Sequence, residues 1–381
     1  MDFKLSDREE LLRKTTREFA EREIRPRMEA MEETGEFPTD LLPELGKMGI
    51  TGVIAPQEYG GAGLGHLARV LILEELGRVC PAIPMALQVH HMGIYALTTW
   101  GNEEQKEKYL PPLAKGETLG VVAVTDPSGG SDVAGMQTTA EKKGDDYILN
   151  GRKCFITNSH HSDIWLVIAR TGEGSKGLSA FLVEKDFPGA KVGRKEDKVG
   201  LRGANTGELI LSDCQVPQAN LLGQEGRGMT IALRDIVECG RPGMASVGLG
   251  ILNATLEEAV KFANERSLYG KPISRLQQIQ VHLAEIYSDL EIARLLTYRV
   301  GWMVDQGLRV DAESALAKSF ACEAAARAAR KAIEIHGSYG VMKEYPVQRL
   351  LRDAIVTIPA GGTAEIAKIV LARQALTAFS G

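Results

Sequence analysis

The sequence predicts an α+β protein in which a β-rich middle segment separates two helical segments. Residues 1–118 and 225–381 repeat apolar side chains at helical spacing, whereas residues 119–224 hold short β-rich runs between turn clusters. Strands that follow one another without intervening helices favour an antiparallel β-barrel or sandwich over βαβ units. We therefore expect an N-terminal helical domain (1–118), a middle β-domain (119–224) and a C-terminal helical bundle (225–381).

The N-terminal segment carries a clear helix start. Ser6 is a capping residue, and the acidic side chains that follow it suit the first turn of a helix. Helical spacing continues to Phe19, is broken by Pro38 and the glycine-rich stretch 60–65, and resumes over 84–99 and 103–113. The glycine-rich stretch follows no strand and lacks the last glycine of a dinucleotide loop, so it does not indicate a Rossmann site.

The middle and C-terminal segments differ in element length. The predicted strands are short, at 121–124, 147–149, 164–168 and 180–183, and turn signals such as Asn150-Gly151 separate them. The C-terminal segment contains long helical patterns at 251–265, 276–306 and 312–336, the last of them rich in alanine. Helices of this length predict a four-helix bundle, a fold that often assembles with copies of itself.

Composition excludes several functional classes. The chain has 381 residues, with 45 Lys and Arg against 50 Asp and Glu, and this net charge of −5 argues against a nucleic-acid partner. The five cysteines are scattered, without the spacing of a disulfide framework or a zinc site, so no metal is expected. A polar N-terminus and the lack of an apolar run near ~20 residues favour a cytoplasmic protein without membrane insertion.

Three segments have the composition of a cofactor site. In the first, a strand ends at Thr125 and Pro and Gly residues hold an open turn through Ser131, rich in N–H donors that suit a planar ring or a phosphate. Taken alone, it also fits an ordinary β-turn. In the second, Phe155 and Thr157 place an aromatic ring and a hydroxyl two residues apart. In the third, Arg266 leaves a helix beside a glycine-containing loop, and its guanidinium suits a pyrophosphate.

With these segments in this order, the sequence resembles the FAD-dependent acyl-CoA dehydrogenases over essentially the whole chain. Matching motifs also lie at 56–61, 101–106, 223–228 and 336–340. The resemblance implies the acyl-CoA dehydrogenase fold, with an N-terminal helical domain, a central β-domain and a C-terminal four-helix bundle. It also implies one FAD per chain, a homotetramer, an acyl-CoA substrate and an electron-transferring flavoprotein as partner.

The same resemblance assigns roles to individual residues. The positions that match contacts to the flavin ring are Thr125, Ser131, Phe155 and Thr157. The positions that match FAD contacts elsewhere, those at the diphosphate lying partly across a subunit interface, are Arg266, Tyr269, Gln277, Gly337, Thr363 and Glu365. The positions that match contacts to the CoA moiety are Ser131, Glu238 and Arg241. Glu334 stands where the family usually has Gln near the diphosphate, and a carboxylate beside phosphates is unfavourable.

The reaction that the resemblance implies needs a base. A thioester α-proton is weakly acidic, its enolate needs hydrogen bonds at the thioester oxygen, and a flavin takes the hydride from the β-carbon. In the family a glutamate in a Tyr-Glu-Gly-Thr turn supplies the base. Here the turn contains Gly361-Gly362-Thr363, which puts Gly361 at that position. Some members place the glutamate just before the arginine that matches Arg241, and that position is Gly240.

Several interpretations of the missing glutamate stay open. The chain resembles a subgroup acting on cyclohexane- or cyclohexene-carboxyl-CoA, which uses an acidic residue in the acyl-pocket helix. His91 stands in that helix and would titrate near neutrality. Asp126, beside the expected flavin, and Glu238 are other candidate bases. We expect a cyclic or unsaturated acyl group. The alternatives are ordinary α,β-dehydrogenation of a short or branched acyl-CoA with a substitute base, and an inactive paralogue that binds acyl-CoA or FAD.

Overall fold

The N-terminal region of the protein is helical. The structure is a computed structural model that describes residues 4–380. Ser6 caps the first helix as predicted, because its hydroxyl accepts the Glu9 N–H at 3.3 Å while the Glu9 carboxylate accepts the Ser6 N–H at 2.6 Å. The main helices of this region are α1 (Asp7–Phe19), α2 (Met28–Thr34), α3 (Leu42–Lys47), α4 (Gly65–Val79), α5 (Ala82–Trp100) and α6 (Glu103–Ala114).

The middle region confirms the predicted β-rich segment. Within residues 4–380, eight strands form one sheet in the order β6-β7-β3-β2-β4-β5-β8, with β1 paired to β4. The strands are β1 (Gly120–Ala123), β2 (Thr139–Lys143), β3 (Asp146–Thr157), β4 (Ile164–Arg170), β5 (Leu178–Glu184), β6 (Ala190–Lys195), β7 (Thr206–Pro217) and β8 (Leu221–Leu222). The sheet is not purely antiparallel, since β1 and β4 are parallel. The β2–β3 hairpin lies between β1 and β4 in the sequence. After this hairpin the chain enters β4 in the same direction in which it ran through β1.

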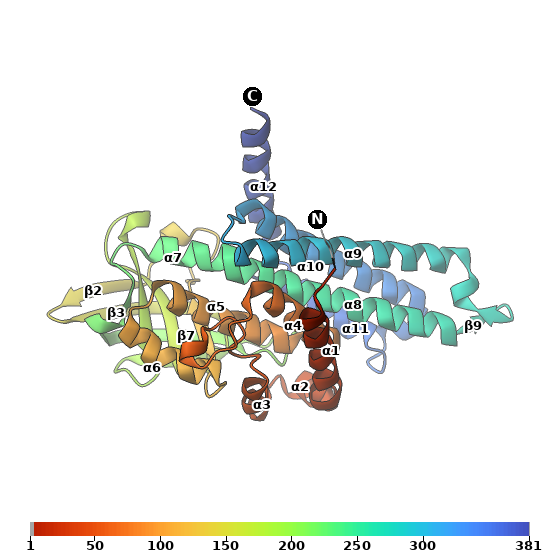
Figure 1. The fold of residues 1–381 in the computed structure, drawn as a ribbon, viewed down its shortest axis with the longest axis horizontal. Helices are drawn as coiled ribbons and strands as arrows, with labels where there is room; N and C mark the ends of the chain where they lie inside the picture. Colours follow the sequence, from red (N-terminus) through yellow and green to blue (C-terminus); the bar gives the residue numbers. More distant parts are fainter. Residues whose placement is uncertain (1–3, 381) are drawn as a thin grey trace.

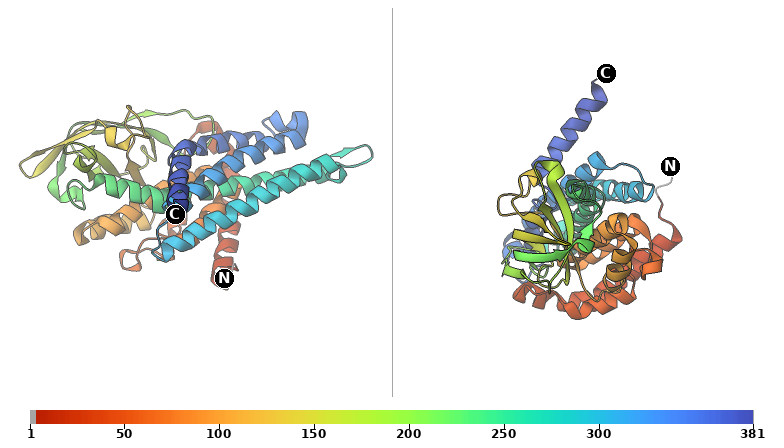
Figure 2. Two further views of the ribbon diagram at one scale, coloured as in Figure 1. Left: turned by 90° about the horizontal axis from the view of Figure 1, so that it is seen from above. Right: turned by 90° about the vertical axis from the view of Figure 1, so that its left-hand side faces the viewer.

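The C-terminal region is helical, as expected. Its elements are α7 (Gly228–Asp235), a π-helical turn η8 (Ile236–Gly240), α8 (Arg241–Glu265), β9 (Ser267–Leu268), β10 (Lys271–Pro272), α9 (Gln277–Asp305), α10 (Asp311–His336), α11 (Val347–Thr357) and α12 (Ala364–Phe379). Helices α8 to α11 form the bundle, and α12 stands away from it (Figures 1 and 2). The β-domain and the β9–β10 hairpin lie at opposite ends of the molecule (Figure 1). No helix within residues 4–380 is long and apolar enough to cross a membrane.

Helices α4 and α8 cross in backbone contact. A Cβ atom added at Gly250 would lie 2.6 Å from the Cα of Gly77, so neither position has room for a side chain. Nearly every residue of α4 is consequently buried, charged residues included. This crossing joins the N-terminal helices to the bundle.

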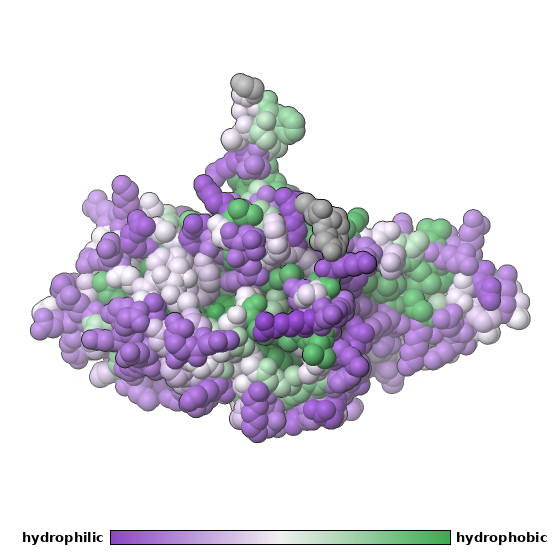
Figure 3. All heavy atoms as spheres, viewed as in Figure 1, coloured by the Kyte–Doolittle hydropathy of each residue, from purple (hydrophilic) through white to green (hydrophobic). Residues whose placement is uncertain are grey.

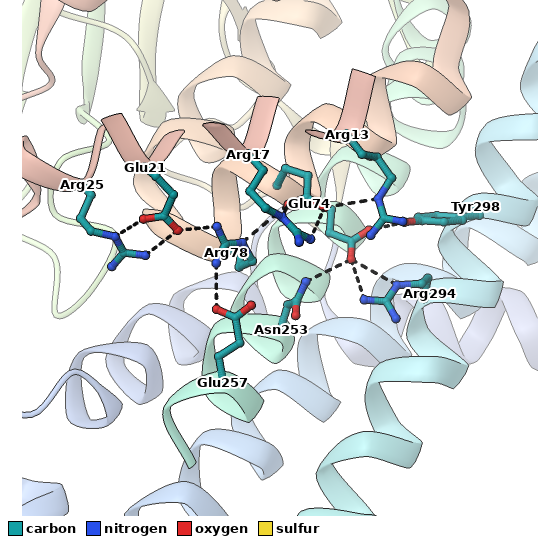
Figure 4. A network of polar contacts seen from close by, with 11 residues as sticks. Arg13, Arg17, Glu21, Arg25, Glu74, Arg78, Asn253, Glu257, Arg294 and Tyr298 are labelled. Atoms are coloured by element: carbon teal, nitrogen blue, oxygen red, sulfur yellow. Dashed lines mark hydrogen bonds and ion pairs between the residues drawn. The ribbon is translucent and has the colours of Figure 1, made fainter. Parts of the chain in front are cut away.

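Two fully buried acids reinforce the crossing (Figure 4). The Glu74 carboxylate accepts hydrogen bonds from Arg294 at 2.9 Å and from the Tyr298 hydroxyl at 2.5 Å, both on α9. The Glu75 carboxylate accepts one from Arg17 of α1 at 2.9 Å. Helices α1 and α9 are therefore tied to α4 by charge-assisted bonds in the interior, where such bonds are strong.

We expect Glu74→Gln to destabilise the protein, because the substitution leaves the Arg294 guanidinium without its buried counter-charge. The expected loss is about 2–4 kcal/mol, measured as a lower denaturant midpoint. Arg25→Gln is the control, since Arg25 pairs with Glu21 at an exposed site and such pairs contribute under ~1 kcal/mol. Equal losses for the two variants would contradict a stabilising role for the buried network.

Candidate active site

The structure brings two of the predicted cofactor segments together. The end of β1 and the end of β3 lie side by side, because the Cys154 N–H donates to the Thr125 carbonyl at 3.0 Å. Phe155 has a φ of +58° and an exposed side chain (66%), whereas Thr157 is buried. An exposed aromatic ring on a strained backbone is typical of a ligand contact, since an exposed side chain makes few contacts that could offset the energy of the strain. Thr125 and Phe155 therefore lie close together on one surface, and the buried Thr157 follows two residues further along β3.

The turn that follows Thr125 is an open cradle. The Gly129 N–H donates to the Asp126 carbonyl at 3.0 Å, and a Cβ at Gly130 would touch the Thr125 side chain at 3.3 Å. Gly129 has a φ of +144°, and within residues 4–380 no atom lies within 4 Å of the Cβ that it lacks. Ser131 is exposed at the end of this turn. The cradle leaves room for a flat group to approach the backbone closely.

Asp126, one of the candidate bases, is fully engaged within the protein. Its carboxylate accepts the backbone N–H groups of Gln137 at 2.6 Å and Thr138 at 2.7 Å, and it pairs with the buried Lys153 ammonium. Burial raises the pKa of Asp126, but Lys153 and these hydrogen bonds outweigh burial and hold that pKa below its ordinary value. The geometry therefore gives Asp126 the role of a turn anchor and disfavours it as a base.

His91, the other leading candidate, is also unsuited to proton transfer. Its Nδ1 accepts a hydrogen bond from Arg69 at 3.3 Å, and its Nε2 lies 2.9 Å from the Ile50 carbonyl. Burial and the nearby Arg69 charge lower the pKa of His91 well below its ordinary value. His91 lies within a helix, α5, as the sequence predicts, and both of its ring nitrogens are occupied. The expectation that His91 serves as the base is therefore not supported.

The β9–β10 hairpin, which carries the predicted diphosphate residue Tyr269, lies at the opposite end of the molecule from the β-domain (Figure 1). Arg266 follows α8, and its guanidinium lies over the Tyr339 ring at 5.6 Å, close to Gly337 at the end of α10. Tyr269 is 89% exposed on the β9–β10 hairpin, and Gln277 begins α9. Within one chain, these residues and the Thr125 surface do not form a single site.

The neighbourhood of Gly337 also contains the departure from the family at Glu334. The Glu334 carboxylate accepts a hydrogen bond from Arg330 at 3.2 Å, one helical turn away on α10. Both side chains are exposed. The arginine supplies a counter-charge to this carboxylate beside the predicted diphosphate residues.

The turn at Gly361 is anchored by a buried lysine. The Lys318 ammonium donates to the carbonyls of Ile358 at 2.6 Å and Gly362 at 2.7 Å. Gly361 has a φ of +67°, and a Cβ there would lie 3.1 Å from the Met244 side chain. Thr363 caps α12 by accepting the Ile366 N–H at 3.3 Å, and hydrogen bonds at that N-terminus lower the pKa of the exposed Glu365.

Two of the predicted CoA-binding residues, Glu238 and Arg241, lie in η8 and at the start of α8. Glu238 accepts hydrogen bonds from the Tyr95 hydroxyl and from Arg234, so its carboxylate is already paired. Arg241 is buried and donates to the Asp311 carbonyl at 3.4 Å. Glu238 is therefore engaged like Asp126, which weakens it as a candidate base.

Sequence analysis missed a group of buried polar residues beside Gly240. They are Arg69 on α4, Gln88 on α5 and Asp235 at the end of α7, and each is nearly or fully buried. The available signal was a charged side chain inside an apolar helical run, as in Ala68-Arg69-Val70-Leu71. One such residue is also typical of a satisfied core arginine, so the sequence did not reveal the cluster.

Comparison with known proteins identifies the class of this site. The chain matches the N-terminal domain of acyl-CoA dehydrogenase over residues 6–117, the middle domain over 121–214 and the C-terminal domain over 226–376. The chain therefore belongs to the acyl-CoA dehydrogenase family, whose members are oxidoreductases that act on acyl-CoA and carry FAD.

Individual relatives cover almost the full chain. An acyl-CoA dehydrogenase of Bacillus subtilis is 45% identical, covering 96% of this chain and 97% of its own length. An acryloyl-CoA reductase (NADH) of Anaerotignum propionicum is 40% identical, covering 99% and 96%. The structure of butyryl-CoA dehydrogenase from Megasphaera elsdenii has a TM-score of 0.96 and 36% identity, covering 99% of this chain and all of that one.

The residues of this chain fit FAD. The Gly129 cradle and the exposed Phe155 leave room for a flat ring system, and the exposed Arg266 supplies a positive charge for a diphosphate. The isoalloxazine ring, when bound, supplies hydride transfer.

We expect Lys318→Met to loosen the Gly361 turn, because the carbonyls of Ile358 and Gly362 lose their buried donor. Faster amide hydrogen exchange over residues 358–363 should accompany a loss of roughly 1–3 kcal/mol in stability. Lys368→Met is the matched control, since Lys368 pairs with Glu323 at an exposed site. Unchanged exchange in Lys318→Met would show that the turn does not depend on this lysine.

Proposed function

We propose that the protein transfers hydrogen between C2 and C3 of an acyl-CoA, with a proton-transfer group that is not at position 361. One observation carries this proposal: both positions at which the family places its glutamate are glycine. A Cβ at Gly240 would lie 3.1 Å from Met92, and one at Gly361 lies equally close to Met244. Two methionine side chains thus stand next to the positions of the missing carboxylates.

The other residues support substrate and cofactor binding without a change of role. Ser131, Glu238 and Arg241 would bind the CoA moiety, as the resemblance implies, and the buried Arg241 supplies positive charge there. Thr125, Phe155 and Thr157 would hold the flavin ring. The chain therefore retains these residues for binding, and its departures from the family pattern are Glu334 and the proton-transfer group.

Two classes of acyl group remain in competition. Relatives named for acryloyl-CoA and butyryl-CoA favour a short acyl chain. The missing glutamate favours a cyclic or already unsaturated acyl group, from which a proton leaves another carbon. We favour the short acyl chain, because the relatives align over nearly the whole length of the protein. The reductase among them makes reduction of an enoyl-CoA as plausible a direction as dehydrogenation.

We further propose that the chain acts as a homotetramer and exchanges electrons with an electron-transferring flavoprotein. The residues proposed for the flavin ring belong to the β-domain, whereas Arg266 and Tyr269 lie by the hairpin at the other end of the chain, so a second copy would have to complete each site (Figure 1). Helix α12 carries exposed apolar side chains at Ile369, Leu376 and Phe379, and it stands free in a position to pack against another copy (Figure 3).

A complementation experiment tests the shared FAD site. Phe155→Asp and Arg266→Ala should each lower bound FAD, because one places charge against the ring and the other removes the diphosphate partner. Coexpression of the two variants with different tags should restore yellow, FAD-containing assemblies, since intact halves then meet across an interface. Mixed assemblies that stay colourless would contradict a site shared between chains, and a monomer that binds FAD fully would contradict the tetramer.

A panel of acyl-CoA thioesters tests the reaction. Acyl-CoA substrates added without oxygen should bleach the bound flavin, and mass spectrometry of the product locates the new double bond. We expect the fastest bleaching with a short acyl-CoA. Fastest bleaching with a cyclohexene-carboxyl-CoA would favour the cyclic alternative. Binding of acyl-CoA without bleaching by any thioester, in either direction, would indicate the inactive paralogue.

Gly361→Glu provides an internal comparison in the same panel. A glutamate there should raise 2-enoyl-CoA formation, since the turn is the one that the family uses for its base. The gain should be partial, because a φ of +67° costs a non-glycine residue about 1 kcal/mol and Met244 must move. Gly361→Gln controls for the steric change, and equal activity of both variants would rule out a base effect.

A further inference from the structure

The buried residues missed by sequence analysis face one side of the η8–α8 helix. Asp235, Gly240 and Gly243 follow each other along this face, with the π-helical turn between the first two. A Cβ at Gly240 would lie 3.7 Å from the Asp235 carbonyl, and one at Gly243 would overlap the Arg69 guanidinium and lie 2.8 Å from the Gln88 Cβ. Asp235 thus sits one π-turn before the position where some family members place the glutamate. Such turns are frequent at functional sites.

Several polar atoms of this cluster have no protein partner. Within residues 4–380, both carboxylate oxygens of Asp235, the Arg69 Nη1 and the Gln88 Oε1 are buried without a hydrogen bond. Asp235 is fully buried, and no side chain of the described residues donates a hydrogen bond to its carboxyl group. Leaving such groups unpaired costs about 1–3 kcal/mol each, which natural proteins tolerate mainly at sites of function.

The other titratable groups near this face are excluded by their contacts or their basicity. His91 and Glu238 are already paired, as described above. His66 has a free Nδ1, but burial lowers the pKa of His66 to about 3, so its imidazole is a weak base. Burial raises the pKa of the Cys239 thiol to about 12, which keeps it protonated. Asp235 is the remaining carboxyl group with free oxygens.

We propose that Asp235 is the proton-transfer group at C2 of the acyl-CoA and that Arg69 is its positioning residue. This inference rests on the proposed function. In the dehydrogenation direction the C2–H bond breaks and its proton moves to an Asp235 oxygen. The electron pair left at C2 enters the new C2=C3 double bond as the C3 hydride leaves for FAD, the oxidant. Reduction of an enoyl-CoA runs the same transfer in reverse.

The surroundings of Asp235 suit this role. Burial raises the pKa of Asp235 well above its ordinary value, and the Glu238 charge adds to this, while the Arg69 charge opposes it. A stronger carboxylate base is better matched to a weakly acidic C–H bond. The titratable or charged groups that face this site are Arg69 and His66 of α4, His91 of α5, and Glu238 and Cys239 of η8. Of these, Arg69 carries the positive charge that would stabilise the Asp235 carboxylate.

Deuterium exchange at C2 tests the proposal without hydride transfer. The probe is a 3-thia-acyl-CoA, in which sulfur replaces C3, so that only the proton step can occur. Mass spectrometry follows its exchange in D₂O with the FAD-containing enzyme. Asp235→Asn should slow exchange ~10²–10⁴-fold, and Asp235→Glu should restore part of it. Asp353→Asn is the matched control, because Asp353 is a buried aspartate of α11 that accepts the Leu201 N–H at 2.6 Å.

A second readout separates proton transfer from a structural role. The rate of C2 exchange in the wild type should rise with pH through a single titration, because the raised pKa leaves Asp235 protonated at lower pH. Arg69→Lys should shift the pH at which this rise occurs, since a guanidinium is replaced by a point charge in another position. If Asp235→Asn fails to fold, the rise of the wild-type exchange rate with pH and its shift in Arg69→Lys still test the proposal. A wild-type exchange rate that does not change with pH overturns the proposal.

The outcomes distinguish this inference from the proposed function. Wild-type rates of exchange in Asp235→Asn, with FAD and acyl-CoA still bound, would overturn the role of Asp235 and leave the proposed function intact. An enzyme that binds the probe but neither exchanges C2 nor bleaches with any acyl-CoA would overturn both. Loss of exchange in Asp353→Asn as well would show a general loss of structure, and the proposal would then fail.

Discussion

The close crossing of α4 and α8 joins the N-terminal helices to the bundle and sets the position of the buried polar residues beside the start of α8. Gly77 and Gly250 bring the two backbones into contact, and the buried acids Glu74 and Glu75 fix the crossing through bonds to α1 and α9. Because α4 lies this deep, its first turns carry Arg69 against Gly243 of α8. The same packing that stabilises the fold therefore places a guanidinium beside the helix face that ends at Asp235.

Buried aspartates serve opposite purposes in the two halves of the site. Asp126 accepts several hydrogen bonds and pairs with Lys153, so its negative charge is fully compensated and it holds the cradle turn in place. Asp235 accepts no hydrogen bond from the described residues, and this difference is the basis of its proposed role in proton transfer. The difference lies in the partners rather than in depth, since both side chains are almost completely buried.

The elongated shape separates the two sets of residues that fit FAD. The residues proposed for the flavin ring belong to the β-domain, whereas Arg266 and Tyr269 lie by the hairpin at the far end of the bundle (Figure 1). An exposed Tyr269 and the exposed apolar side chains of α12 have little function in an isolated chain. Both features are understandable if copies of the chain complete one another, which links cofactor binding to assembly.

The sequence by itself determined the α+β class, the succession of elements and the chemistry of the cofactor segments, because periodicity, caps and turn residues are local signals. The Ser6 cap and the long bundle helices follow from such signals. It also located Gly240 and Gly361 at the two positions where the resemblance leads us to expect a glutamate. Only the tertiary structure decided the state of the candidate bases, since Ile50, Lys153 and Tyr95 are distant in sequence from His91, Asp126 and Glu238. Asp235 became visible for the same reason: burial and the lack of a partner are properties of packing, which no single sequence segment encodes.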